Sequence, residues 1–266
     1  MDTIEETYQK VKAQFSKACD EFHLIEKGDR IMVGLSGGKD SLLLSNFLSI
    51  FRDEHPGTFE VICAHIKFDN LPYSVDGEYL KKFCADRKIE YFLVTDQIRE
   101  AHLEKGTCLH CSHYRRAKLM ELCRLKNCNK LALGHHLDDI VATLLMSMTQ
   151  HGRFGGMAIK LPITVGEHKY PLTIIRPLCY TPEQDIIDYN AAHDYKPTKC
   201  RCPWGDAGQR SKTREAEEIL CQIGPEVRLN LFKSQFNVHE KQIGQAEQFE
   251  IEECDKEFKS CDGCSH

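Results

Sequence analysis

The stretch IMVGLSGGKDSLLL, residues 31–44, decides the fold of this chain. Its first five residues form an apolar run typical of a buried strand, and the residues after the two glycines have a helical composition. Gly37 and Gly38 allow a tight turn that exposes successive backbone N–H groups where the helix begins. Such N–H groups and the positive end of the helix dipole favour an anionic phosphate. The sequence therefore predicts a strand-to-helix turn that binds phosphate.

Three polar side chains in the same stretch support this interpretation. Lys39 supplies a positive charge, and Ser36 and Ser41 supply hydroxyl donors. The spacing differs from GxxxxGK followed by Ser or Thr, which is the phosphate loop of the common nucleoside triphosphatases. An ordinary strand-to-helix turn without a ligand is the alternative, because a pair of glycines alone also occurs in such turns.

Apolar runs alternate with helical patterns around this stretch. Strands are expected at residues 31–35, 59–68, 90–96 and 129–136, and helices at residues 36–51, 76–88, 111–127 and 137–150. Strands that alternate with helices form βαβ units on a parallel sheet, with helices on both faces. We therefore expect an α/β fold built on a parallel, doubly wound sheet.

The two ends of the chain differ from this central pattern. An amphipathic N-terminal helix is expected within residues 1–27, ahead of a main domain at 28–240 and a polar, cysteine-containing tail at 241–266. After residue 150 we expect a glycine-bearing loop, a hairpin that turns near Gly166, and C-terminal helices. The first of these helices has Thr181 as its expected cap and Pro182 at its first helical position.

The composition indicates a cytoplasmic protein. Residues are 41% hydrophobic, enough for one substantial core. No window approaches the roughly 18 uninterrupted apolar residues of a membrane span, and the first residues are charged, unlike a secretory signal. We expect most of the 14 cysteines to stay as thiols in a reducing compartment. The net charge of −5 does not indicate nucleic-acid binding, although basic residues gather at 115–118 and 196–214.

Two adjacent carboxylates form a second candidate patch. Asp138 and Asp139 lie in GHHLDDIVATLL, residues 134–145, just after an expected strand. Ligands of open α/β sheets bind at the carboxyl ends of the strands, and acidic residues are also favoured in the first turn of a helix by its dipole. These residues are therefore either ligand contacts, with Asp139 the stronger candidate, or helix caps.

The cysteine pair in GTCLHCSHYRR, residues 106–116, has several possible roles. Cys108 and Cys111 have the C-x-x-C spacing of a zinc site, a redox dithiol, a disulfide or an iron–sulfur ligand set. A tetrahedral structural zinc needs four ligands, and Cys200 with Cys202 would complete such a set. The pair alone does not decide between these roles.

The stretch at 31–44 resembles the PP-loop of the ATP pyrophosphatases, which cleave ATP between its α and β phosphates and adenylate a substrate oxygen. The resemblance implies a parallel sheet of the adenine-nucleotide α-hydrolase type. It further implies that the loop surrounds the pyrophosphate, that Asp40 holds Mg²⁺, that backbone after the second strand cradles adenine, and that His135 helps to shape the pocket. The residues implied to bind the nucleotide are Ser36, Gly37, Gly38, Lys39, Asp40, Ser41, Ala64, Ile66, Gly134 and Asp139.

The order of motifs over residues 28–222 resembles the TtcA-type tRNA 2-thiocytidine synthetases, and the TtuA-type tRNA thiolases share the core. These motifs are the PP-loop, C-x-x-C before a basic helix, GHHLDD, GRFGGM, IIRPL, and a cysteine followed by proline. The resemblance implies that Cys108, Cys111 and Cys202 hold a 4Fe–4S cluster with one iron open for sulfur, Cys200 being the alternative third ligand. It implies that these cysteines, Lys39 and Asp40 carry the catalysis.

The same resemblance implies a reaction and its partners. ATP with Mg²⁺ adenylates the C2 oxygen of a cytidine in a tRNA anticodon loop, and sulfur from a cysteine desulfurase or inorganic sulfide then replaces that oxygen. A homodimer is expected. Arg115 and Arg116 are expected to contact tRNA phosphate or to neutralise the cluster, with a solvated helix face as the alternative. Arg153 and Lys160, in and after the glycine-bearing loop, are expected to contact phosphate unless the loop is an ordinary connection.

Two departures from the pattern leave other functions open. The N-terminus lacks the paired cysteines of the zinc ribbon that TtuA-type thiolases carry, which favours the TtcA type. The tail adds Cys254, Cys261, Cys264 and His266, which have no close family equivalent. One alternative is a PP-loop enzyme that adenylates another base or a carboxylate, with the cysteine pair as a zinc or persulfide site. Another is a nucleotide-binding or sulfur-carrying module without turnover.

Overall fold

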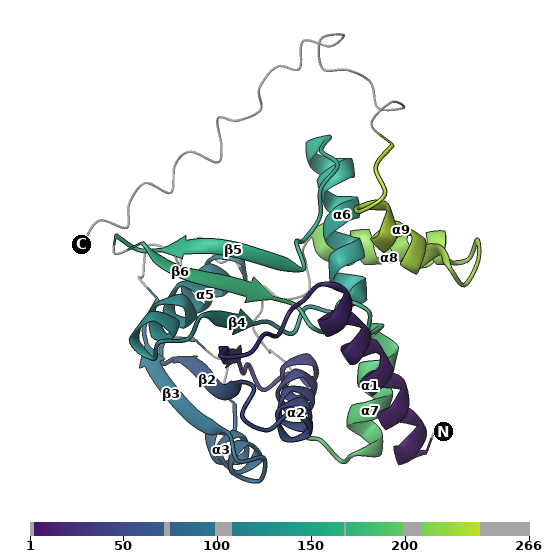
Figure 1. Ribbon diagram of the computed structural model, residues 1–266. Coiled ribbons are helices and arrows are strands. Elements are labelled where there is room, and N and C mark those ends of the chain that lie inside the picture. Colours follow the sequence, from purple (N-terminus) through teal and green to yellow (C-terminus); the bar gives the residue numbers. More distant parts are fainter. Residues whose placement is uncertain (1–2, 72–74, 99–107, 168, 199–208, 240–266) are drawn as a thin grey trace.

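A six-stranded sheet forms the centre of the computed structural model, with the strand order β3-β2-β1-β4-β6-β5 (Figure 1). The structure describes residues 3–71, 75–98, 108–167, 169–198 and 209–239, without the side chains of 108, 109, 209 and 210. The strands are β1 (Arg30–Gly34), β2 (Glu60–Phe68), β3 (Glu90–Asp96), β4 (Lys130–Ala132), β5 (Lys160–Val165) and β6 (Tyr170–Ile175). All neighbours pair in parallel except β5 and β6.

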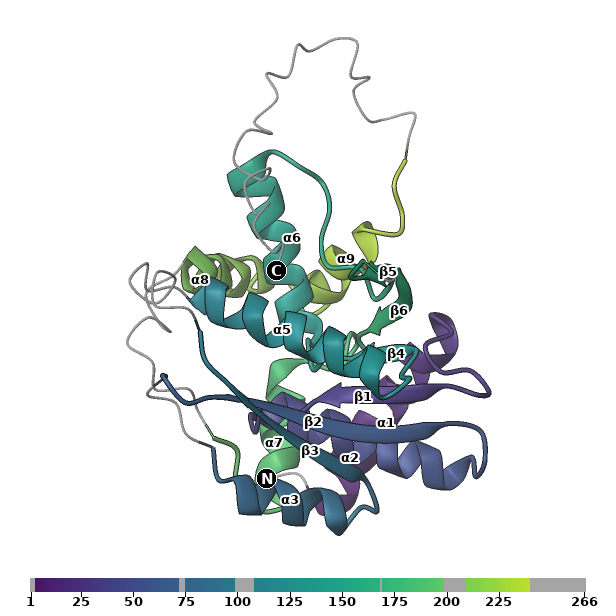
Figure 2. The same cartoon turned by 90° about the vertical axis from the view of Figure 1, so that its left-hand side faces the viewer.

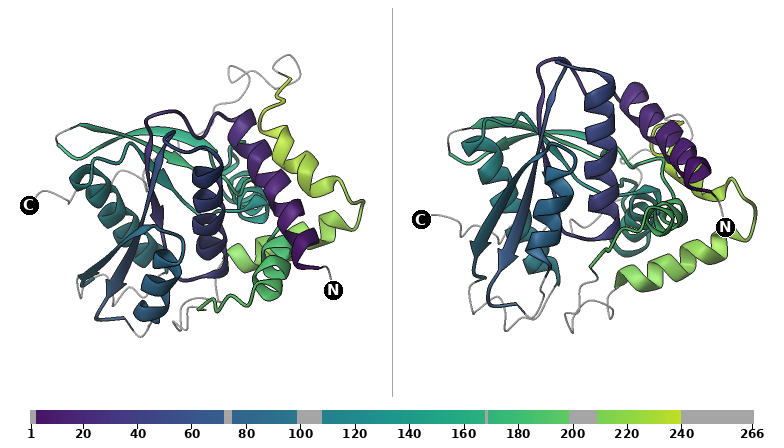
Figure 3. Two further views of the ribbon diagram at one scale, coloured as in Figure 1. Left: turned by 60° about the horizontal axis from the view of Figure 1, so that its bottom comes forward. Right: turned by 90° about the horizontal axis from the view of Figure 1, so that it is seen from below.

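Helices cover both faces of this sheet (Figures 2 and 3). They are α1 (Ile4–Glu21), α2 (Lys39–Glu54), α3 (Gly77–Ala85), α5 (Cys108–Leu125), α6 (Leu137–His151), α7 (Glu183–Ala192), α8 (Gln209–Cys221) and α9 (Val227–Ser234). On one face α1, α2, α3, α6 and α7 contribute to the larger hydrophobic core. On the other face α5 packs over a smaller core, and it is the only described helix in that core.

The central strand β1 shows why the two cores separate. Ile31 and Val33 belong to the larger core and Met32 to the smaller one, because successive side chains of a strand point to opposite faces. All three are fully buried, and β1 lies between β2 and β4. A strand buried on both faces reads as a continuous apolar run, which is how the sequence predicted it.

The order of strands determines where a ligand can bind. The chain leaves β1 into α2, and it leaves β4, the neighbour of β1, into α6. β2 and β4 flank β1 on opposite sides, so a topological switch point lies at the carboxyl ends of β1 and β4. The expected phosphate loop and the GHHLDD turn therefore meet at the same edge of the sheet.

The expected α/β fold is confirmed, with three local differences. The hairpin turns at Gly166 (φ +63°) and joins the sheet through β6, so that β5 is an antiparallel edge strand. The helix with the cysteine pair begins at Cys108, three residues earlier than expected. Pro182, not Thr181, is the N-cap of α7, because a carboxylate from another helix occupies the first turn of α7, as described below.

The N-terminal helix α1 packs into the larger hydrophobic core. Thr3 and Glu6 form a capping box at its start, in which each side chain accepts a hydrogen bond from the backbone N–H of the other residue. Phe15 lies in the larger core with its ring 5.7 Å from that of Phe47. None of the described helices has both the length and the apolar content needed to cross a membrane.

Candidate nucleotide-binding site

The loop between β1 and α2 has the backbone of an anion site. Gly37 adopts φ +83°, a conformation that favours glycine, and a Cβ added there would lie 2.6 Å from a methyl group of Val75. Gly38 is the N-cap of α2 and has no side chain, so no cap side chain accepts hydrogen bonds from the first N–H groups of the helix. These N–H groups and the helix dipole favour a phosphate at this end of α2.

Two serines shape the loop from inside. The Ser36 N–H donates to Ser41 Oγ at 3.1 Å, and the two hydroxyl oxygens are also 3.1 Å apart. The Gly38 N–H donates to Ser36 Oγ at 3.2 Å, and the buried Ser41 hydroxyl donates to the Gly38 carbonyl at 3.0 Å. The serines expected to bind phosphate therefore also fix the conformation of the loop.

Lys39 lies between two carboxylates. Its Nζ is 2.9 Å from Asp40 Oδ1 and 2.8 Å from Glu183 Oε1 of α7. Burial alone would lower the pKa of Lys39, but the charges of Asp40 and Glu183 outweigh burial and raise it. Lys39 is therefore a cation whose charge is balanced by two carboxylates.

A pocket of about 580 Å³ opens beside these groups. Gly38, Lys39, Asp40, Glu183, Ile187, Asn190, Ala191, Tyr195, Pro197 and Thr198 line it. The Thr198 N–H donates to the Gly37 carbonyl at 2.8 Å, and the Asn190 side-chain amide donates to the Lys39 carbonyl at 3.4 Å. The wall formed by α7 and the segment after it is thus bonded directly to the phosphate loop.

Gly134 brings the second patch against the first. A Cβ added at Gly134 would lie 3.1 Å from the carbonyl carbon of Asp40 and 3.2 Å from its Cβ. Since these are largely backbone atoms, a side chain there would push α2 and the β4–α6 turn apart. The structure therefore places Gly134 beside the expected nucleotide residues, where it permits a close approach of two helix N-termini.

His136 lies at the centre of a carboxylate cluster. Its ring is almost fully buried, with Nε2 3.4 Å from Asp139 Oδ2 and 4.0 Å from Asp40 Oδ1, and Nδ1 3.4 Å from Asp138 Oδ2. Burial alone would lower the pKa of His136, but these three carboxylates together raise it. The imidazole therefore gains a proton more readily than an isolated histidine.

Both aspartates of GHHLDD pair with other helices. Asp138 accepts a hydrogen bond from the Glu183 N–H at 2.8 Å, and this is the carboxylate that occupies the first turn of α7. Asp138 Oδ1 also lies 3.2 Å from Arg228 Nε of α9. Arg214 of α8 bridges two acids, with Nη2 2.9 Å from Asp139 Oδ1 and Nη1 3.2 Å from Glu183 Oε2. Burial tends to raise the pKa of Asp138, but these partners and His136 lower it.

The expected adenine contacts lie within β2, not after it. Ala64 pairs with Gly34 at the last residue of β1, and its carbonyl accepts from the Leu35 N–H at 2.8 Å. Strand β2 continues for four more residues because its pairing with β3 extends to Phe68. Alternate residues direct their backbone groups to the same side of a strand, so the N–H and C=O of Ile66 point to the side where β1 has ended.

The cysteine ligand set lies only partly within the described residues. Cys111 is half-buried, one helical turn after Cys108, where α5 begins. The side chain of Cys108 lies outside the described part of the chain, as do Cys200 and Cys202. In the described parts, no set of three His, Cys, Asp or Glu side chains is arranged to hold a metal ion by itself.

The segment with Cys200 and Cys202 is flanked by parts of the site just described. On one side the chain is described up to Thr198, whose N–H is bonded to the phosphate loop. On the other side it resumes with α8, which carries Arg214 and its bonds to Asp139 and Glu183. The cysteine-bearing tail, with Cys254, Cys261, Cys264 and His266, also lies outside the described residues.

Several expected basic contacts are placed by the structure. Arg115 lies half-buried on α5, with its guanidinium 5.8 Å from the ring centre of Phe68 at the end of β2. Arg116 is half-buried as well, and its charge adds to burial in lowering the pKa of Arg176 to about 10. Neither arginine is on a fully solvated face. Lys160 donates to the His23 carbonyl at 2.6 Å, away from the switch point.

His135 has a different environment from its neighbour His136. The guanidinium of Arg176, which follows β6, donates from Nε to His135 Nδ1 at 3.2 Å and from Nη1 to the Ala158 carbonyl. Sequence reasoning proposed His135 for the pocket and did not identify His136, Glu183 or Arg214. A local signal existed only for Glu183, an acid in the first turn of a predicted helix.

Comparison with known proteins supports the nucleotide-binding interpretation of this site. The chain matches the PP-loop domain family over residues 7–198. A tRNA-cytidine(32) 2-sulfurtransferase from Citrifermentans bemidjiense is 32% identical over 244 residues, which is 89% of this chain and 93% of that protein. The protein of the same name from Aliivibrio fischeri is 37% identical over 198 residues, 72% of this chain and 62% of its own length.

A solved structure shares the architecture. The U34-tRNA thiolase NcsA from Methanococcus maripaludis, solved with its 4Fe–4S cluster, has a TM-score of 0.70 to this chain at 22% identity. The likeness covers 92% of this chain and 82% of that chain. At this level of identity it establishes the fold, including the mostly parallel sheet and the helices around it.

Replacing Gly134 with alanine tests the close approach of the two helices. We expect Gly134→Ala to weaken ATP binding at least tenfold and to lower the free energy of unfolding by about 1–3 kcal/mol, because the added methyl group meets the backbone of Asp40. Calorimetric titration and urea unfolding measure the two effects. Gly155→Ala is the matched control, since no atom lies within 4 Å of a Cβ there. Equal ATP affinity in both variants would contradict the steric role.

The raised pKa of His136 predicts a pH dependence of stability. A histidine whose folded-state pKa is raised stabilises the fold fully below its unfolded pKa of about 6.5, and this stabilisation is lost as the pH rises through the folded value. As the pH rises above about 6.5 and through the folded-state pKa, the free energy of unfolding of the unmodified protein should therefore fall relative to that of His136→Gln. Urea titrations of both proteins check this, and parallel pH curves would refute it.

Proposed function

The chain belongs to the PP-loop domain family, and from this premise we propose that it is an ATP-dependent tRNA sulfurtransferase that thiolates C2 of an anticodon-loop cytidine. The observation that carries the proposal is the similarity to the C. bemidjiense tRNA-cytidine(32) 2-sulfurtransferase, which extends over nearly the whole of both chains. The geometry agrees, because the phosphate loop, the end of β2 and the first turns of α5 meet at one edge of the sheet.

The phosphate loop is proposed to hold the β and γ phosphates of ATP. The Gly37 N–H and the N–H groups in the first turn of α2 donate to the phosphate oxygens, while the Gly38 N–H keeps its bond to Ser36 Oγ. Lys39 then exchanges its contact with Glu183 for a contact with phosphate. Asp40, whose carboxylate borders the pocket, is proposed to bind Mg²⁺, a cation that prefers carboxylate and phosphate oxygens. Both cations stabilise charge on the departing pyrophosphate.

The adenine ring is proposed to lie against the open side of β2. The N–H and C=O of Ile66 point to the side where β1 has ended, and together they match the donor and acceptor on one edge of adenine. His65 supports this segment, since its buried ring lies with Nδ1 2.8 Å from the Leu35 carbonyl. Burial lowers the pKa of His65, which favours the neutral ring.

Cys108, Cys111 and Cys202 are proposed to hold a 4Fe–4S cluster, with Cys200 as the alternative third ligand. The donor chemistry fits, because cluster irons prefer thiolate ligands. The position also fits, because Cys108 and Cys111 lie in the first turn of α5, where the helix dipole favours thiolates. When bound, a cluster with three protein ligands supplies an iron position that can carry sulfur.

The proposed reaction has two balanced steps. The C2 oxygen of the cytidine attacks the α-phosphorus of ATP, and the bond to pyrophosphate breaks. A sulfur nucleophile then adds at C2, and AMP leaves with the former C2 oxygen. The sulfur nucleophile is hydrosulfide, which comes from inorganic sulfide or from the persulfide of a cysteine desulfurase after a cellular thiol has reduced it by two electrons. The working form is proposed to be a cytoplasmic homodimer.

Pyrophosphate release and nucleoside analysis test the reaction. We expect the purified, cluster-loaded protein to release pyrophosphate from ATP only with unmodified tRNA and to form 2-thiocytidine when sulfide is added. Lys39→Ala should lower the rate by at least a hundredfold, because the transition-state charge loses a cation. Pyrophosphate release with a carboxylate acceptor and not with tRNA would refute the proposal.

Iron analysis of cysteine variants tests the ligand set. After anaerobic purification, Cys111→Ser and Cys202→Ala should lose most of their iron and sulfide, whereas Cys200→Ala should keep them. Cys221→Ser, at the end of α8, is the control for a half-buried thiol outside the set. If Cys200→Ala lost iron and Cys202→Ala kept it, Cys200 and not Cys202 would be the third ligand. Stoichiometric zinc without iron in the unmodified protein would exclude the cluster.

A further inference from the structure

The far end of α6, the loop that follows it and the end of α9 form a projecting surface (Figure 1). We call this surface the α6 tip and define it by Met148, His151, Arg153, Phe154, Phe236, Val238 and His239. Its large apolar side chains are unusually exposed: Met148 45%, Phe154 52%, Phe236 55% and Val238 42%. None of the four belongs to either hydrophobic core.

Close contacts hold the parts of the α6 tip together. Gly152 ends α6 in a left-handed conformation, and the Arg153 N–H donates back to the Ser147 carbonyl at 3.1 Å. The loop then passes α9, because a Cβ added at Gly156 would lie 2.0 Å from the side-chain oxygen of Gln235. This contact brings the loop against the end of α9. Phe154 lies two residues before Gly156, and Phe236 directly follows Gln235.

The α6 tip is free of acidic residues along its own segments. Residues 142–160 and 227–239 contain no Asp or Glu, in a chain that has 40 of them and a net charge of −5. The same segments contain Arg153 and Lys233, together with His151 and His239, whereas Arg228 is paired with Asp138 and Glu217, and Lys160 with Glu26. The exposed acids of neighbouring elements are Glu215 and Glu218 on α8, Glu226 directly before α9, and Asp20, Glu21 and Glu26 at and after the end of α1. A surface with positive charge and exposed aromatic rings thus interrupts an acidic protein.

We infer that the α6 tip binds an RNA strand of the substrate, at a distance from the reacting base. This inference rests on the proposed function. Exposed aromatic rings stack on unpaired bases, and nearby cations contact phosphate. α6 starts at the switch point, and Met148 lies 11 residues after Leu137, about 16 Å along the helix axis. One anticodon arm can therefore reach the catalytic edge and the α6 tip together.

The charge of the α6 tip favours RNA over a second copy of the chain. Exposed Phe, Met and Arg side chains also occur in protein–protein interfaces, so composition alone does not separate the two. Phe154 directly follows Arg153 and precedes two glycines, so a cationic and an aromatic residue share one short loop. Repeating this surface on a symmetric partner would place like charges together, whereas a phosphate backbone neutralises them.

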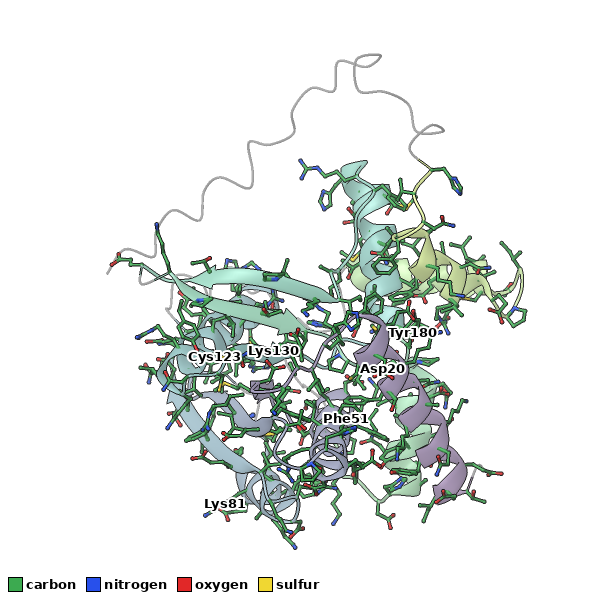
Figure 4. The ribbon with its side chains drawn as sticks, viewed as in Figure 1. Asp20, Phe51, Lys81, Cys123, Lys130 and Tyr180 are labelled. Atoms are coloured by element: carbon green, nitrogen blue, oxygen red, sulfur yellow. The ribbon has the colours of Figure 1, made fainter. Side chains whose placement is uncertain are left out.

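Binding measurements on two tip variants test the inference. Phe154→Ala should raise the Kd for tRNA about tenfold, because one base loses its stacking platform. Arg153→Glu should raise the Kd for tRNA at least tenfold. It should also lower the slope of log Kd against log salt concentration by the amount expected for the loss of about one phosphate contact. ATP affinity should stay unchanged in both. Leu93→Ala, at an exposed apolar residue of β3, and Lys81→Glu, on α3 at the opposite end of the molecule (Figure 4), are the matched controls.

The outcomes separate this inference from the proposed function. Unmodified protein that neither binds tRNA nor releases pyrophosphate with it would overturn the proposed function. Unmodified protein that does both, with tip variants that bind tRNA as tightly as the controls, would overturn the role of the α6 tip alone. Dissociation of a dimer by Phe154→Ala in sedimentation, with tRNA affinity per chain unchanged, would assign the surface to a second copy and also overturn it.

Discussion

The whole site depends on the burial of His136 among three carboxylates. Asp40, Asp138 and Asp139 each approach its ring within 4.0 Å, and they come from α2 and α6, which start at the switch point. Adjacent acids at this depth repel one another unless cations lie between them. The two arginines of α8 and α9 supply such cations, and His136 adds a third when its ring is protonated. Removing one member leaves a buried charge unpaired, which typically costs about 3–5 kcal/mol.

This network connects the nucleotide loop to the part of the chain that carries the late cysteines. Glu183 contacts Lys39 through one oxygen and Arg214 through the other. In the proposed complex, where Lys39 contacts phosphate, the full negative charge of Glu183 would remain for Arg214 and would strengthen the attraction between them. Arg214 lies on the helix that follows the segment with Cys200 and Cys202, and Thr198, before that segment, is bonded to Gly37. Both ends of the segment are therefore connected to the phosphate loop through contacts of described residues.

The sequence predicts well what depends on local patterns. The strand before the phosphate loop, the glycine turn and α2 follow from a few neighbouring residues, and so does the βαβ order. The end of β2 at Phe68 followed as well, because the expected strand covered residues 59–68, although the expected adenine contacts at Ala64 and Ile66 lie within that strand and not after it. The cap of α7 was misplaced by one residue, because Asp138 from another helix accepts the bond that Thr181 was expected to accept. No local pattern reports such a bond between distant segments.

The missed site residues show the same limit. No feature of the sequence favours His136 over its neighbour His135 as a site residue. Only the close approach of α2 and α6 in the structure distinguishes the two. Gly134 was identified through its motif, but the reason for it is the backbone of Asp40, 94 residues earlier in the chain. Arg214 lies in a basic stretch whose other members gave no reason to select it. Ion pairs between distant segments are the part of a site that a single sequence does not specify.

The uneven covering of the sheet explains how a large substrate reaches this site. On one face several helices bury β1, β2 and β4, while α5 is the only described helix over the other face. The start of α5 then lies at the carboxyl edge, where Cys111, Arg115 and Arg116 are half-buried and no further described helix covers them. The pocket beside the phosphate loop lies between α2 and α7, on the more covered face. The same fold thus has a walled pocket on one side of the phosphate loop and, at the start of α5, a side that no further described helix covers.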